Sequence, residues 1–191
     1  MISEFPLGLF ALRHCRTEYN VTQRISGKSD SSIVDYSIDI SALDLINTQN
    51  QDFLIISSTL ARCVKTVSSL LKQNSEFHPR ISIDSRITER GMGHWEGKFK
   101  VDILQKYPQY CYCGQINPFV TPPQGETIGE FSTRIDEFIN DLRKVSPNTS
   151  ILICAHNQSL KLLKYKLTGG VDLLDFWITN TFQNGKIERI Y

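Results

Sequence analysis

Three apolar runs have the length and composition of buried β-strands. They cover residues 7–12, where only Gly8 interrupts the run, residues 53–56 (Phe-Leu-Ile-Ile) and residues 151–155 (Ile-Leu-Ile-Cys-Ala). Runs of about four to eight apolar residues are typical of strands that are covered on both faces. Ile81 and Ile83 alternate with polar residues, which predicts a further short strand.

Helical periodicity follows the later strands. Ser57 and Ser58 are predicted to cap a helix that reaches about Leu71. Thr127 and Glu130 have the spacing of a capping box, and apolar residues then recur on one helical face. These apolar residues are Ile128, Phe131, Ile135, Phe138 and Leu142.

A third helical pattern follows residue 156, with Leu160, Leu163 and Leu167 on one face. Strands that alternate with helices predict an α/β fold with a largely parallel sheet. The other segments are predicted to form a polar, turn-rich loop over residues 20–36, a short helix over 41–45, and a connecting tail over 169–191 that ends in an edge strand over 186–190.

Composition excludes several classes of partner. The 191 residues, 40% hydrophobic and 21% charged, suit a soluble globular protein, and we expect one domain over residues 1–191. A formal net charge of +1 gives no basis for binding nucleic acid or a membrane surface. The first residues, Met-Ile-Ser-Glu-Phe-Pro, lack the pattern of a signal peptide. Five cysteines, an odd number, predict reduced thiols, so we expect a cytoplasmic protein.

Two of the predicted strands end on a histidine. Arg13 and His14 follow the first strand, with Arg16 close behind, and His156 follows the strand at 151–155. Open α/β sheets bind their ligands beyond the carboxyl ends of the strands. An imidazole between guanidinium groups suits a phosphate or a carboxylate. The alternative is that both histidines are core residues whose ring nitrogens are satisfied by backbone carbonyls.

Six motifs, in order along the chain, resemble those of the histidine phosphatase superfamily, also called phosphoglycerate-mutase-like. The first, Arg-His-Cys-Arg-Thr-Glu-Tyr-Asn, is similar to the family's Arg-His-Gly-x-Ser/Thr-x-x-Asn. The last, Ala-His-Asn-Gln-Ser-Leu-Lys, is similar to Ser/Ala-His-Gly-x-x-x-Arg. The motifs lie at residues 13–20, 24–30, 58–66, 89–97, 123–134 and 155–161.

The resemblance implies a three-layer α/β/α sandwich with a central, mostly parallel sheet. It also implies phosphoryl transfer without a metal or cofactor. In that scheme His14 is the nucleophile that forms a phosphohistidine, and Arg13 and Arg62 bind the phosphoryl oxygens. His156 is a second donor to these oxygens, most useful when protonated, and Glu89 gives a proton to the leaving group and later activates water. The residues expected to bind the rest of the substrate are Arg16, Asn20, Ser26, Gly27 and Asn157.

Four positions depart from the family pattern, and all four are expected at the rim of the pocket. Cys15 and Asn157 replace glycines. Of the non-glycine residues, asparagine best tolerates a left-handed backbone. Lys161 replaces an arginine. Arg16 adds a positive charge and predicts a substrate with extra negative charge, such as a second phosphate or a carboxylate.

Several residues also admit a purely structural role. Arg62 would then cover its own helix with its stem, and Glu89 would pair on the surface with Arg86 or Arg90. Trp95 is expected to be a packing anchor. The residues that would only shape a loop are Asn20, Ser26 and Gly27.

The segment at residues 107–121 is rich in aromatic residues. It either caps the pocket or packs on itself as a surface loop; the residues concerned are Tyr110, Tyr112, Pro118 and Phe119. Cys111 and Cys113, with His94, suggest a metal site, but their spacing is unlike that of structural zinc, and we interpret them as part of a loop.

Three functions fit these patterns. The favoured one is a phosphatase that acts on a small phosphomonoester. A phosphoglycerate-type mutase is the second, but mutases of this type carry a longer, arginine-rich insertion, whereas residues 97–150 hold only Arg134 and Arg143. The third is a module that binds a phosphorylated ligand without catalysis. The oligomeric state stays open, a homodimer built through the tail included.

Overall fold

The computed structural model describes residues 8–43 and 52–191. Its centre is a five-stranded sheet with the order β5-β4-β8-β1-β9. Four strands are parallel, and only the edge strand β9 runs antiparallel to β1, so the predicted mostly parallel sheet is confirmed. The strands are β1 (Gly8–Arg13), β4 (Asp52–Ser58), β5 (Arg80–Asp84), β8 (Thr149–Ala155) and β9 (Ile187–Arg189).

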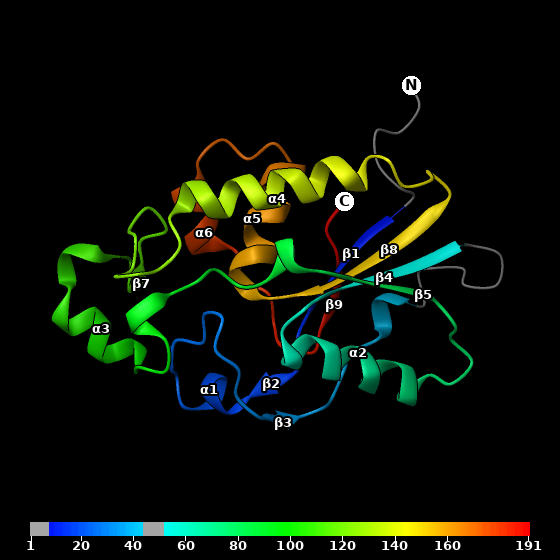
Figure 1. Ribbon diagram of the computed structural model, residues 1–191, viewed down its shortest axis with the longest axis horizontal. Helices are drawn as coiled ribbons and strands as arrows, with labels where there is room; N and C mark the ends of the chain where they lie inside the picture. The colour runs from blue at the N-terminus through cyan, green and yellow to red at the C-terminus, as the bar shows by residue number, and fades with distance from the viewer. Residues whose placement is uncertain (1–7, 44–51) are drawn as a thin grey trace.

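Helices cover both faces of the sheet, which confirms the three-layer arrangement. On one face lie α4 (Ile128–Leu142), α5 (Asn157–Leu167) and α6 (Leu173–Thr179), and on the other lies α2 (Ala61–Gln73) (Figure 1). The tail at residues 169–191 therefore contains a helix, α6, where a connecting loop was expected.

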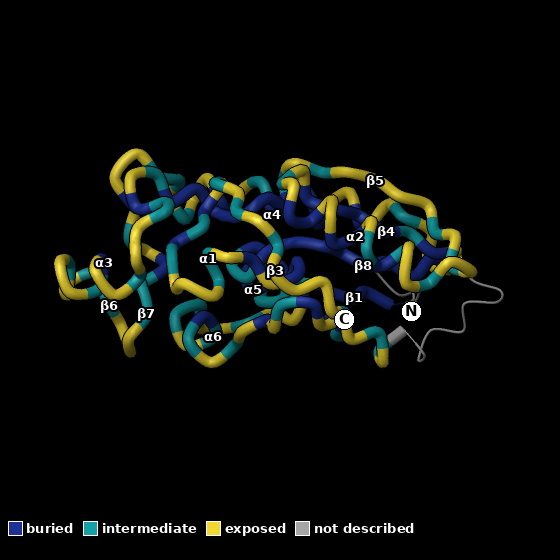
Figure 2. Tube along the Cα trace, turned by 90° about the horizontal axis from the view of Figure 1, so that it is seen from below, coloured by how far each residue is buried: buried dark blue, intermediate teal, exposed yellow. Residues whose placement is uncertain are grey.

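The central strands are buried on both sides, as their uninterrupted apolar sequences predicted. Along β1, Leu9 and Ala11 pack in the cluster that includes α4 and α5, whereas Phe10 and Leu12 pack in the cluster that includes α2. This alternation follows from the two-residue period of a strand. In Figure 2, β1 and β8 are dark blue while the edge strand β5 is yellow.

The loops beyond the carboxyl end of the sheet form small elements of their own (Figure 1). Trp95 is buried among Ile25, Met92 and Ile103, with Tyr107 and Tyr110 stacked nearby, so it is the packing anchor that was expected. Tyr112 and Phe119 are instead 47% and 54% exposed. The elements are β2 (Arg16–Thr17), α1 (Glu18–Val21), β3 (Ile33–Asp35), η1 (Ser41–Leu43), η2 (Ser85–Ile87), η3 (Gly93–Trp95), α3 (Lys100–Lys106), η4 (Pro108–Tyr110), β6 (Cys111–Tyr112) and β7 (Gln115–Ile116).

The predicted cap of α2 is wrong. Ser57 and Ser58 belong to β4, because their backbones pair with the neighbouring strands, and the residue at the N-cap position is Leu60. The free N–H groups at this helix end are satisfied by Asp30, whose carboxylate accepts from the backbones of Ala61 and Arg62. A cap delivered from a distant loop leaves no signal beside the helix. The short helix predicted over residues 41–45 is present as η1, and its last two positions lie outside the described residues.

Within the described ranges, none of the helices is both long enough and apolar enough to cross a membrane.

The capping box of α4 gives a test of these local rules. Thr127 and Glu130 exchange hydrogen bonds between side chain and backbone, as predicted. Thr127→Ala removes the cap, so we expect the free energy of unfolding in urea to fall by about 1 kcal/mol. The control Thr133→Ala, at an exposed position inside the same helix, should leave stability equal or slightly higher, because alanine has the better helix propensity. Equal stability of the two variants would contradict the assignment.

Candidate active site

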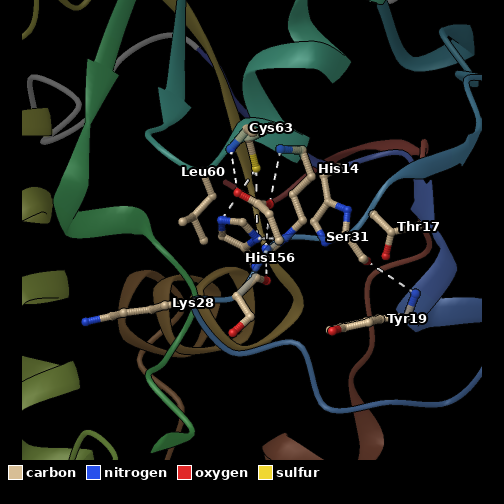
Figure 3. Close-up of polar contacts among 12 residues, drawn as sticks. His14, Thr17, Tyr19, Lys28, Ser31, Leu60, Cys63 and His156 are labelled. Carbon is tan, nitrogen blue, oxygen red and sulfur yellow. Dashed lines mark hydrogen bonds and ion pairs between the residues drawn. The ribbon is translucent and has the colours of Figure 1, made fainter. Parts of the chain in front are cut away.

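The pairing of β1 with β8 brings the two predicted histidines together. Arg13 is paired with Ala155, and the backbone N–H of His14 donates to the carbonyl of Ala155 at 3.1 Å. The imidazole rings of His14 and His156 then lie 5.3 Å apart, centre to centre (Figure 3). This is the arrangement expected from two parallel strands that end at the same edge of a sheet.

His14 is held in one tautomer. Its Nδ1 lies 2.8 Å from the carbonyl oxygen of Cys15. Because a carbonyl only accepts, Nδ1 carries the proton and Nε2 keeps its lone pair. Burial, together with the charges of Arg62 and Arg13, holds the pKa of His14 well below 6.5. The ring is therefore neutral at physiological pH, which is the form that can act as a nucleophile.

His156 is also neutral. Its protonated form was expected beside a dianionic ligand, and that expectation stays a prediction. The Nε–H of Arg62 donates to Nδ1 of His156 at 3.1 Å, so Nε2 carries the proton and bonds to the Ser58 hydroxyl at 2.8 Å. Cys63 Sγ lies 3.5 Å from the same Nε2 (Figure 3). Burial and the charge of Arg62 are the main causes that hold the pKa of His156 well below its usual value.

Arg13 has an unsatisfied donor in the site. Its Nη1 donates to the carbonyl of Phe182 at 2.8 Å, but its Nε is buried without a hydrogen-bond partner. Burial lowers the pKa of Arg13, while the charge of Glu89 raises it. A buried donor without a partner costs about 1–3 kcal/mol, so this guanidinium is prepared to bind an anionic oxygen.

Arg62 binds the segment at residues 27–30 in this structure. Besides His156, its guanidinium donates to the carbonyls of Gly27 and Ser29 and forms an ion pair with Asp30 at 2.8 Å. Arg62 thus lies beside both histidines, as expected, but most of its N–H groups already have acceptors within the protein. The alternative of a stem that merely covers its own helix is wrong.

Glu89 is buried at the N-terminus of α5, and the alternative of a surface ion pair is wrong. One carboxylate oxygen accepts from the backbones of Arg90 and Ser159, and the other accepts from the backbone of Gln158. The Arg90 guanidinium binds three backbone carbonyls, and Arg86 pairs with two aspartates instead. The three backbone donors fix the orientation of the Glu89 carboxylate in the cleft.

Of these residues, Arg13 and Glu89 line a cleft of about 830 Å³, which also contains the residues predicted to bind the rest of the substrate; His14, Arg62 and His156 are buried and are not among its lining residues. Two of these predicted residues, Asn20 and Asn157, also form hydrogen bonds within the protein. Asn20 Oδ1 accepts from Thr17 and Asn184, and Asn157 Oδ1 accepts from the backbone of Phe182. The predicted residues on the cleft wall are Arg16, Asn20, Ser26, Gly27 and Asn157.

The family departures take positions that differ from those expected. Asn157 is the first residue of α5 and is not among the residues with positive φ, so its backbone is not left-handed. Cys15 is fully buried below the rim, with its backbone N–H bonded to Thr66. Lys161 is also buried, but it reaches the cleft wall. Only Arg16 is an exposed rim residue, and it pairs in register with Asp35.

Two features of the site were missed at the sequence level. Lys100 and Lys161 both line the cleft, and only the replacement of an arginine at position 161 pointed to either. The loop at residues 107–121 packs partly on itself, since Tyr107 stacks on Tyr110, and Pro118 of the same loop lines the cleft; contact with a leaving group stays a prediction. Among residues 8–43 and 52–191 there is no cluster of three metal-ligating side chains, and Cys111 Sγ instead contacts backbone carbonyls.

Glu96 organises the loop over Arg62. Its carboxylate accepts from the backbones of Lys28, Ser29 and Met92 and from the Ser29 hydroxyl. Burial raises the pKa of Glu96, but these hydrogen bonds lower it by more, so that the pKa lies below its ordinary value. Gly27 packs so closely here, with φ of 51°, that an added Cβ would lie 2.2 Å from the Glu96 carboxylate. The segment at residues 27–30 is therefore held between Glu96 and Arg62.

Comparison with known proteins agrees with this geometry. The family model of the histidine phosphatase superfamily (branch 1) matches residues 9–191. Phosphoserine phosphatase 1 of Hydrogenobacter thermophilus is 26% identical over 173 residues, which are 88% of this chain and 79% of that protein. The 2,3-bisphosphoglycerate-dependent phosphoglycerate mutase of Bartonella quintana is 25% identical over 84% of this chain and 81% of its own length. The structure of Bacillus stearothermophilus YhfR superposes with a TM-score of 0.78 at 22% identity, covering 94% of this chain and 88% of that one, which shows a shared fold.

The anchoring role of Glu96 predicts a change in amide exchange. In Glu96→Gln one acceptor oxygen becomes an NH2 donor that faces the same N–H groups, so the loop loses its attachment. We expect hydrogen exchange at the amides of Lys28 and Ser29 to become at least about tenfold faster, which corresponds to ~1.4 kcal/mol. The matched control is Glu137→Gln on the exposed face of α4. Unchanged exchange at both amides in Glu96→Gln would contradict the assignment.

The two buried histidines predict how stability depends on pH. Above pH 6.5 they are neutral in the folded and unfolded chains alike, so they add no pH dependence. As the pH falls below 6.5, the unfolded chain takes up protons that the folded chain excludes, and stability falls by up to about 1.4 kcal/mol per pH unit for each histidine. Urea unfolding at pH 6.5 and 5.5 should show this loss. The exposed-site variant His78→Gln should retain it, and equal stability at both pH values would refute the neutral pair.

Proposed function

This chain belongs to the histidine phosphatase superfamily (branch 1), and we propose that it is a phosphatase that hydrolyses a small phosphomonoester through a phosphohistidine. One observation carries the proposal. His14 is neutral, with the proton fixed on Nδ1, and it stands beside the unsatisfied Nε of Arg13. A neutral imidazole next to a fixed cation is the pairing that nucleophilic attack on a phosphate monoester requires.

In the first step, His14 Nε2 attacks phosphorus. An N–P bond forms while the ester P–O bond breaks, and the protonated carboxyl of Glu89 gives its proton to the departing oxygen. Arg13 binds the equatorial oxygens, where negative charge develops. Arg62 contributes its positive charge beside the histidines. It binds a phosphoryl oxygen directly when that oxygen replaces the carbonyls of residues 27–30 as the acceptor of its guanidinium N–H groups.

In the second step, water replaces the histidine. The Glu89 carboxylate takes a proton from a water molecule, whose oxygen attacks phosphorus while the N–P bond breaks. Inorganic phosphate leaves, and His14 and Glu89 return to their starting states. In this scheme the neutral His156 orients Arg62 through their hydrogen bond; when the dianionic substrate offsets the charge of the arginines, Nδ1 takes up a proton and exchanges this bond for one to a phosphoryl oxygen.

Hydrolysis is favoured over transfer within a substrate by the composition of the cleft. Relatives of this chain include both phosphatases and mutases. A mutase must hold its substrate in two orientations, which calls for several anion-binding groups opposite the nucleophile. The arginines between Glu89 and His156 are already engaged: Arg90 binds carbonyls, Arg134 binds Glu126 and Arg143 bonds to Asn140. We also propose that the reaction needs no metal, and that Arg16 adds positive charge at the cleft entrance for an anionic leaving group.

A trapping experiment tests the mechanism. We expect the wild type to release phosphate from para-nitrophenyl phosphate in the presence of EDTA and to form an acid-labile, base-stable phosphoenzyme after a rapid quench. His14→Ala should lose both, with activity at least about 10³-fold lower. The exposed-site control His78→Ala should keep full activity. Turnover that survives in His14→Ala would overturn the proposal, and conversion of phosphoglycerate isomers without phosphate release would identify a mutase.

A further inference from the structure

Lys161 is a buried cation in the wall of the cleft. It belongs to α5, it is 2% exposed, and its Nζ donates to the carbonyl of Trp177 in the last turn of α6. Both Lys161 and Trp177 line the cleft. A lysine that only capped α6 would not need to face the cavity in which the substrate is proposed to bind.

The ammonium group of Lys161 is under-satisfied. It has three N–H donors, yet in the described part of the chain its one hydrogen-bond acceptor is the Trp177 carbonyl, and no carboxylate forms an ion pair with it. Lys166, on the same helix, does pair with an aspartate, Asp136, at 2.8 Å. A buried charge without a counter-ion is costly, so such a group is retained where a ligand supplies the counter-ion.

The groups around Lys161 place it close to the proposed catalytic residues. Burial is the main cause that lowers the pKa of Lys161 to about 8; the charge of Glu89 acts to raise it, and those of Arg13 and Lys100 act to lower it. The ammonium is therefore mostly charged at neutral pH and close enough to Glu89 and Arg13 to feel both. Glu89 forms no direct ion pair with Lys161, and its two carboxylate oxygens accept instead from the backbones of α5 and Arg90.

Within the proposed function, we propose that Lys161 is a specificity residue that binds a carboxylate on the leaving group, so that the preferred substrates are phosphorylated hydroxy or amino acids. Its two remaining N–H donors and its single charge match one carboxylate, whereas a second phosphate dianion would remain half neutralised. Arg16 adds positive charge at the cleft entrance, but it is exposed there beside Asp35, whereas Lys161 is buried in the cleft wall. Two relatives act, by their names, on phosphoserine and phosphoglycerate, which both carry a carboxylate within two carbons of the phosphorylated carbon.

Matched pairs of esters isolate the carboxylate. O-phosphoserine and O-phosphoethanolamine differ only by that group, and 3-phosphoglycerate and glycerol 3-phosphate differ by its reduction to an alcohol. We expect the wild type to have a higher kcat/KM for the acid in at least one pair. Lys161→Gln should lower kcat/KM for that acid at least about tenfold, mainly through KM, and leave its partner within about twofold. Lys161→Arg, which keeps the charge, should retain the preference.

The control Lys164→Gln removes an equal charge from the same helix outside the cleft and should leave both members of each pair unchanged. Equal losses for acid and partner in Lys161→Gln would show a structural cap of α6 and overturn the proposal, as would a wild type without preference in either pair.

Binding in the His14→Ala background separates this proposal from the proposed function. Calorimetry with the same four esters measures the carboxylate preference without turnover, and His14→Ala/Lys161→Gln should lose it. A preference in binding with no hydrolysis by the wild type would support the carboxylate site and overturn the phosphatase. Hydrolysis by the wild type, with equal binding of each acid and its partner in His14→Ala, would support the phosphatase and overturn the carboxylate site.

Discussion

The register of β1 against β8 is the constraint on which the site depends. The two strands pair over six residues, and their last pair, Arg13 with Ala155, sets His14 and His156 at the same level. A shift of one strand by a single residue would turn its side chains to the opposite face of the sheet. In β1, Leu9 and Ala11 would then face the core at α2, and Phe10 and Leu12 would face the core at α4 and α5. The burial of β1 therefore fixes the position of the proposed nucleophile, since hydrophobic packing on both faces permits one register.

A second dependence is electrostatic and links the charges of the site to its chemistry. Arg13 and Arg62 help to keep both histidines neutral, and in the proposed mechanism the same two cations bind the phosphoryl group. An anion that neutralised the arginines would relax this effect on the imidazoles. Arg62 is also the point where the loop at residues 27–30, the first turn of α2 and His156 meet, through Gly27, Asp30 and the imidazole Nδ1. In the proposed mechanism, substrate binding and the position of this loop are therefore coupled through one guanidinium.

The sequence predicts the parts of this structure that follow from periodicity, and it fails where contacts cross the chain. The apolar runs located the core strands, the capping box located α4, and two strands ending on histidine located the site. The cap of α2 was missed because Asp30 supplies it from a loop thirty residues away. The neutral state of His156 and the buried position of Cys15 depend on packing that no local pattern encodes. Lys161 looked like a simple replacement for arginine, and only its burial beside Trp177 shows what is unusual about it.

The last segment of the described chain completes the site formed by the first strand. Arg13 is held by the carbonyl of Phe182, the carbonyl of His14 accepts from Asn184, and β9 closes the sheet beside β1. The two residues of each hydrogen-bonded pair are separated in the sequence by 169 positions (Arg13 and Phe182) and by 170 positions (His14 and Asn184). At a synthesis rate of about 5–20 residues per second, β1 would wait on the order of 10 to 30 seconds for these partners. During synthesis the proposed nucleophile is thus present long before the residues that complete the pocket around it.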